Sequence, residues 1–166
     1  MDIREIIKKR CSIREYSAKE IPDEILEELI DCGRMAPTAR GEEPWEFVVV
    51  KNKETLKKIA FLTGRNAPFL KEAFACIAVF CRPVKYYIED GSAATENILL
   101  AAASYRIASC WIAGDKKDYA QNIKELLKAD KEYNLMSLIS LGYPKSGLTL
   151  QKQKRPLKEL LHWEKF

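Results

Sequence analysis

The chain has 166 residues, of which 47% are hydrophobic and 31% charged, a composition typical of one soluble globular domain and not of a disordered chain. Its net charge of +4 permits an anionic ligand. It does not favour nucleic-acid binding, because the sequence has no basic recognition helix and no clustered stacking aromatics. The five cysteines include no C-x-x-C pair, which argues against a disulfide framework and against a structural zinc site.

The N-terminus has none of the features of a secretory leader. Its first residues, MDIRE, are charged and amphipathic, and no apolar run in the chain is long enough to span a bilayer. We therefore expect a cytoplasmic protein with no membrane partner.

Hydrophobic periodicity predicts an alternation of helices and strands. In chain order, the predicted elements are helix 2–10, helix 21–35, strand 47–50, helix 53–62, strand 75–81, helix 90–106, an extended segment at 109–114, helix 116–129, strand 135–141 and a partly helical end from 156. Residues 11–20 are expected to be extended chain or loop, and residues 63–72 a loop with room for a short helical turn. Because the strands are fewer than the helices and are separated by them, the pattern favours a mixed α+β or α/β-layered fold in a single domain, residues 1–166.

Helix 90–106 is the most apolar of these elements. From Ala93 to Ala103 its only polar residues are Thr95, Glu96 and Asn97. A helix that is apolar on more than one side must be buried on more than one side. We therefore expect this helix to pack in the centre of the domain or against a partner chain.

Residues 10–14, RCSIR, form the first candidate binding segment. In extended chain, alternate residues face the same way, so Arg10, Ser12 and Arg14 would share one face while Cys11 and Ile13 face the core. Two guanidiniums and a hydroxyl on one face suit a phosphate or another anion. The alternative is that the arginines are ordinary surface residues paired with nearby acids such as Glu5 and Glu15.

Two further segments are candidates. Residues 152–155, KQKR, form a second basic cluster, for which a solvated charged loop is the alternative. Trp111 to Asp115 forms a strand end and a small-residue turn, whose backbone N–H groups could bond the edge of a ligand. Gly114 in that turn has the simpler interpretation that it supplies a positive φ angle.

Several common active-site patterns are absent. The single histidine, His162, has no evident Ser-His-Asp partners, and the acids show no pairing typical of a hydrolase. The sequence contains neither G-x-x-x-x-G-K-[ST] nor G-x-G-x-x-G.

The order of the segments resembles the nitroreductase family of flavin mononucleotide (FMN)-dependent oxidoreductases along nearly the whole chain. The family pattern appears as R-x-S-x-R at 10–14, P-T-A at 37–39, P-W-x-F-V-V-V at 44–50, the alanine-rich helix from Asp90, W-I-x-G at 111–114, L-G-Y-P at 141–144 and R-P-L at 155–157. The resemblance implies a nitroreductase-like fold, with a mostly antiparallel central sheet flanked by helices. It also implies a homodimer with two FMN molecules at the subunit interface.

The resemblance further implies a role for each candidate residue. Arg10 and Ser12 would hold the phosphate and ribityl end of FMN, Lys154 and Arg155 would complete the phosphate site, and Arg14 would lie near the flavin pyrimidine edge. The turn of Trp111, Ile112, Ala113 and Gly114 would place backbone N–H groups near flavin N5. Pro37, Thr38 and Ala39 of the other protomer would border the ring and the ribityl chain.

Two positions depart from the family pattern. The resemblance also places Gly41 in the cofactor site, at a position where family members often carry an asparagine that bonds the cofactor. Glu43 stands where glutamine is usual, and its carboxylate would oppose negative charge on reduced flavin unless Arg40 pairs with it.

The predicted activity is hydride transfer from NADH or NADPH to flavin N5, followed by reduction of a nitroaromatic, a quinone or a similar small acceptor. The flavin would carry this chemistry, so no catalytic side chain is required. The alternative is a flavin-binding carrier or redox sensor without turnover. A third hypothesis is a small basic nucleic-acid-binding domain, which is supported by the net charge alone.

Overall fold

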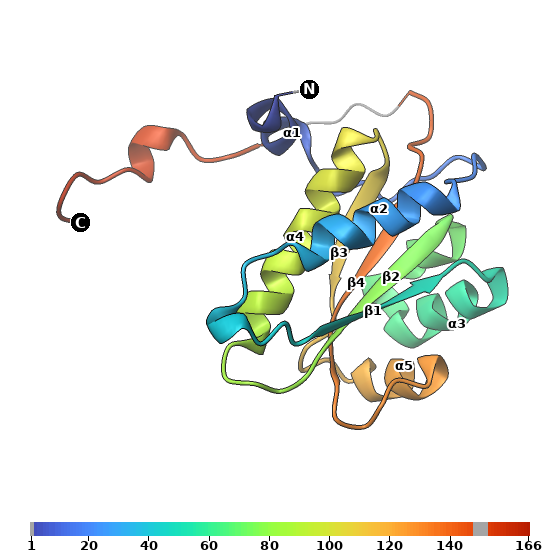
Figure 1. The fold of residues 1–166 in the computed structure, drawn as a ribbon. Coiled ribbons are helices and arrows are strands. Elements are labelled where there is room, and N and C mark those ends of the chain that lie inside the picture. The colour runs from blue at the N-terminus through green and yellow to red at the C-terminus, as the bar shows by residue number, and fades with distance from the viewer. Residues whose placement is uncertain (1, 148–152) are drawn as a thin grey trace.

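The computed structural model describes residues 2–147 and 153–166 (Figure 1). Its helices are α1 (Ile3–Lys9), α2 (Asp23–Arg34), α3 (Lys53–Thr63), α4 (Tyr87–Ser104) and α5 (Ala120–Leu127). Its strands are β1 (Trp45–Val50), β2 (Ala75–Cys81), β3 (Ala108–Ala113) and β4 (Asn134–Gly142). None of the described helices is long and apolar enough to cross a membrane.

The strands form one antiparallel sheet in the order β1-β2-β4-β3. Strands β1 and β3 are therefore its two edges. The predicted α+β class is confirmed, since the helices pack on an antiparallel sheet and do not link parallel strands.

Both faces of the sheet are covered, which explains why β2 is buried along its whole length. Ile77 and Val79 point to the core under α2 and α4, and the alternating Ala78 and Phe80 point to the core under α3 and α5. Figure 1 shows the two helix pairs on opposite sides of the sheet. Such two-sided burial turns the alternating pattern of a strand into a continuous apolar run.

Helix α4 lies between the sheet and the other helices of its layer. Ala94, Ile98 and Ala102 are buried in the core that it shares with α2 and the strands. One chain buries this helix along one broad side and leaves Ala93, Leu100 and Ala101 on the other side half-buried, so it meets the expectation only in part.

Some boundaries differ from the prediction, each for a local reason. Helix α5 begins at Ala120 and not at Lys116, because Lys116 has a φ of 56°, which is incompatible with a helix. The loop predicted at 63–72 holds two short 3₁₀ helices, Gly64–Asn66 and Pro68–Glu72. The C-terminal segment has a single 3₁₀ turn, at Leu157–Glu159.

Candidate functional site

The N-terminal candidate segment lies along the outer edge of β3. The Ile13 N–H donates to the Ser109 carbonyl at 2.9 Å, and Ser12 forms an isolated bridge with Ser109. The Tyr16 hydroxyl, which donates to the Ile13 carbonyl at 2.8 Å and bonds Ser140 Oγ at 2.6 Å, fixes the segment from the core side. Burial of the Tyr16 side chain raises its pKa, so the hydroxyl stays a neutral donor. Ser12 and Arg14 are left exposed.

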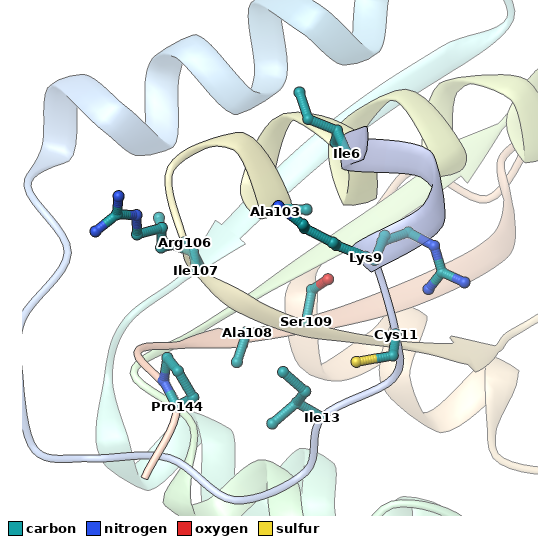
Figure 2. Close-up of a pocket in the computed structure, with 11 residues that line it drawn as sticks. Ile6, Lys9, Cys11, Ile13, Ala103, Arg106, Ile107, Ala108, Ser109 and Pro144 are labelled. Atoms are coloured by element: carbon teal, nitrogen blue, oxygen red, sulfur yellow. The ribbon is translucent and has the colours of Figure 1, made fainter. Parts of the chain in front are cut away.

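A cavity of about 340 Å³ opens beside Arg10, between α1, the end of α4 and the start of β3 (Figure 2). Its apolar wall includes Ile6, Ile13 and Ile107, and its cationic residues are Lys9, Arg10 and Arg106. Arg10 is one-fifth exposed and its Nε lies 3.4 Å from Glu96 Oε1. The predicted alternative, pairing of the segment's arginines with nearby acids, thus applies to Arg10, although the acid comes from α4 and is neither Glu5 nor Glu15.

A second cavity of about 170 Å³ brings Arg14 together with β3. It is lined by Arg14 and by Cys110, Trp111, Ile112 and Ala113, and also by Asn66, Phe69, Lys117 and Tyr119. The Arg14 guanidinium lies 5.7 Å from the centre of the Phe69 ring, a cation–π contact that helps to hold the charge at this edge.

The outer edge of β3 presents backbone groups to this cavity. Ser109 turns its carbonyl outward to the Ile13 N–H, and Ala113 turns its carbonyl outward to the Tyr119 hydroxyl. In an antiparallel pair, alternate residues face the same edge, so the N–H groups of Trp111 and Ala113 also point outward. The Gly114 N–H does not, because it donates to the Met136 carbonyl of β4 at 3.0 Å. Gly114 does not have a positive φ angle, so the simpler interpretation, that it is needed to supply one, is wrong.

The loop that contains Pro37, Thr38 and Ala39 leads into β1, an edge strand, and is bonded to the first turns of α4. The segment of Arg14 runs instead along β3, the other edge strand. Neither cavity described above includes a residue of this loop. One chain therefore brings Arg14 and residues 111–113 together, but not residues 37–39.

The loop is held by Asp90, a residue whose role the sequence did not predict. Thr38 Oγ1 donates to Asp90 Oδ2 at 2.9 Å, and the Ala39 N–H donates to Asp90 Oδ1 at 3.1 Å. Gly41 has a φ of 68° with no atom within 4 Å of a Cβ built on it. No ion pair joins Arg40 to Glu43 in the described part of the chain, so the Glu43 carboxylate is not neutralised in that way.

The second basic cluster lies on the C-terminal segment. Lys154 and Arg155 are exposed, and Arg155 is paired within the segment to Glu159, with Nε 3.5 Å from Oε2. Figure 1 shows this segment running past α1 and away from the sheet. Lys152, the first residue of the cluster, lies outside the described residues. Within one chain, Lys154 and Arg155 do not join the cavity beside Arg10.

Comparison with known proteins assigns the family. The model of the nitroreductase family matches residues 7–77 and 83–143. The chain belongs to the nitroreductase family. The predicted resemblance is thereby confirmed over most of the chain.

Individual nitroreductase relatives cover nearly the whole length. A protein of Archaeoglobus fulgidus named "Putative NADH dehydrogenase/NAD(P)H nitroreductase" is 40% identical over 149 residues, which is 84% of each chain. A protein of the same name from Methanothermobacter thermautotrophicus is 35% identical, covering 87% of this chain and 78% of that protein. The solved structure of an FMN-dependent nitroreductase from Clostridium difficile superposes with a TM-score of 0.87 at 31% identity, covering 97% of this chain and 98% of that one.

The donor set of this nitroreductase chain fits FMN. Arg10 and Ser12 offer a cation and a hydroxyl for a phosphate, Arg14 offers a fixed positive charge at the β3 edge, and the outward N–H groups of Trp111 and Ala113 offer donors to the edge of a ring. Sequence reasoning missed Asn66, Phe69 and Lys117, because they come from loops with no recognisable pattern.

Proposed function

We propose that this chain is an FMN-dependent oxidoreductase that takes electrons from NADH or NADPH and passes them to a small acceptor such as a nitroaromatic or a quinone. Family membership and the names of its relatives support the NAD(P)H-dependent oxidoreductase class and the FMN cofactor. The observation that carries the assignment to this site is the meeting of Arg14 with the outward N–H groups of β3 at one cavity.

The residues of the chain act by binding and by electrostatics. Arg10 and Ser12 bind the phosphate and ribityl end, and the N–H groups of Trp111 and Ala113 orient the ring edge. The chemistry that FMN would supply here is acceptance of a hydride from reduced nicotinamide and transfer of the two electrons to the acceptor. Arg14 stabilises negative charge at the pyrimidine edge, so this site favours the reduced form of the cofactor. No side chain is required as an acid, a base or a nucleophile.

We further propose that the working unit is a homodimer, with the 37–39 loop of one copy completing the cofactor site of the other. Two observations support this arrangement. In one chain, no residue of the 37–39 loop lines either the cavity beside Arg10 or the cavity beside Arg14. The C-terminal segment also exposes large apolar side chains, among them Leu157 (72%) and Trp163 (81%), which a second copy would cover.

The first experiment is to mix the protein with excess FMN, desalt it and record the visible spectrum, then add NADH or NADPH without oxygen. One retained FMN per chain that is bleached by the nicotinamide is the expected result. Retained FMN without steady-state turnover on any acceptor would favour the carrier or sensor. Loss of all the flavin on desalting would contradict the assignment of the site.

A variant tests the role of Arg14. Arg14→Gln removes the positive charge but keeps a polar side chain. Because this charge would stabilise the reduced flavin, we expect the potential of bound FMN to fall by about 30 mV or more. For a two-electron couple, 30 mV corresponds to roughly 1.4 kcal/mol. Lys19→Gln is the matched control, since Lys19 lies over the Tyr143 ring and outside the cavity. Equal potentials for the two variants would refute the role of Arg14.

A further inference from the structure

The loop from Thr38 to Glu43 is held in a conformation that L-residues rarely adopt. Arg40 has a φ of 61°, Gly41 of 68° and Glu43 of 41°. Left-handed backbone at a non-glycine residue costs about 1–2 kcal/mol and persists only where the surrounding structure enforces it. Two such residues, one on either side of Gly41 within four positions, therefore require an anchor.

Asp90 is that anchor, in the first turns of α4. Its side chain is buried, with 4% exposure, and its two carboxylate oxygens accept separately from Thr38 Oγ1 and from the Ala39 N–H. Thr38 Oγ1 in turn accepts from the Glu43 N–H at 3.0 Å. The buried carboxylate thus holds the Ala39 end of the loop directly and the Glu43 end through the Thr38 hydroxyl.

This network also limits what the loop can offer to a ligand. The Thr38 hydroxyl proton and the Ala39 N–H are both committed to Asp90. A carboxylate suits this position because it presents two acceptors, whereas a buried charge without donors would be strongly unfavourable. The loop therefore satisfies Asp90, and Asp90 shapes the loop.

We propose that Asp90 is a positioning residue that preorganises the 38–43 loop to receive FMN bound by the second copy. The proposal rests on the proposed function for the identity of the ligand, but the shape of the loop can be tested without it. Apparent affinity falls in proportion to the fraction of the protein whose loop is already in the binding conformation. Loss of the charged acceptor should therefore weaken FMN binding about tenfold without removing any atom that touches the cofactor.

The test compares Asp90→Asn with the control Thr95→Val. Thr95 is also buried in α4, and its hydroxyl bonds the Gly91 carbonyl at 2.7 Å and Ser137 Oγ at 2.8 Å, away from the loop. Both variants lose a buried polar interaction, but only Asp90→Asn should raise amide hydrogen exchange at Ala39 and Glu43 in the protein without FMN. Only Asp90→Asn should also weaken FMN binding, measured by fluorescence titration.

Substitutions at Thr38 distinguish positioning from general destabilisation. Thr38→Ser keeps the hydroxyl and should retain wild-type amide exchange at Ala39 and Glu43 in the protein without FMN. Thr38→Val removes the hydroxyl and should raise that exchange as Asp90→Asn does, which gives the same readout if Asp90→Asn folds poorly. Unchanged exchange at Ala39 and Glu43 in Asp90→Asn and in Thr38→Val would overturn the proposal. If exchange rises as expected while wild-type protein binds no FMN, the anchor stands and the proposed function fails.

Discussion

The turn after β3 is fixed by close packing against β4, and Gly114→Ala tests this directly. A Cβ at Gly114 would lie 2.7 Å from Leu135 Cγ, 2.8 Å from the Leu135 carbonyl oxygen and 3.0 Å from the Met136 carbonyl carbon. Two of these atoms belong to the backbone of β4, which is held in the sheet, so the clash must be relieved by a displacement of the turn. Overpacking of this kind costs about 2 kcal/mol, and losing the bond from the Gly114 N–H to the Met136 carbonyl costs about 1 kcal/mol more.

The expected loss of about 3 kcal/mol should lower the melting temperature by about 6–12 °C for a domain of this size. Displacement of the turn should also weaken FMN binding, because Trp111 and Ala113 immediately precede it. The assays are thermal unfolding and fluorescence titration with FMN. Gly147→Ala is the control: with a φ of 82° and no atom within 4 Å of its Cβ, it should cost only about 1–2 kcal/mol and leave FMN affinity unchanged. A Gly114→Ala protein as stable as wild type would refute the reasoning.

Two further predictions concern the loop and the buried thiols. Gly41→Asn should tighten FMN binding about threefold to tenfold in a titration, because asparagine tolerates a φ of 68° and adds a hydrogen-bonding amide, whereas Gly41→Ala should not. Burial raises the pKa of the Cys76 and Cys81 thiols to about 12 from 9.0. The contribution of each thiol to folding stability is therefore complete below pH 9 and is lost between pH 9 and 12. Over that range the free energy of unfolding falls by about 1.4 kcal/mol per pH unit for each thiol. Denaturant titrations should show a shallower decline for Cys76→Ala, and an equal slope would contradict the assignment.

The strands and the apolar helix were predictable because their signals are local. The run ACIAVFC has no polar residue, and a strand covered on both faces leaves that trace in any context. The start of α5 was missed because Lys116 adopts a left-handed conformation that nothing in its side chain predicts. Likewise, no local pattern reveals that the outward N–H groups of β3 are those of Trp111 and Ala113, since this depends on the pairing with β4.

The candidate site was predictable only where a part of it lies in a local sequence motif. The family pattern points to Arg14 and to residues 111–113 separately, and the structure brings these two segments to one cavity. The family pattern includes Asp90, but its contact with the loop is not predictable from it, because an acid in the first turns of a helix is ordinary and its partner Thr38 lies 52 residues away in the chain. Glu96, the partner of Arg10, was hidden for the same reason, since it lies on a helix that sequence analysis marked only for its apolarity.

The distribution of the donors has an energetic consequence under the proposed function. Each copy holds Arg10, Ser12 and Arg14 beside β3, whereas its 38–43 loop lines neither of the cavities there, so a complete site would need two chains. Cofactor binding and dimerisation are then linked. The free energy by which bound FMN stabilises the dimer equals the free energy by which dimerisation strengthens FMN binding. A preformed loop increases this coupling, because its conformational entropy is lost on folding and not on binding. Under the proposed function, the buried carboxylate of Asp90 therefore contributes to FMN affinity by holding the loop in shape, without contacting the cofactor.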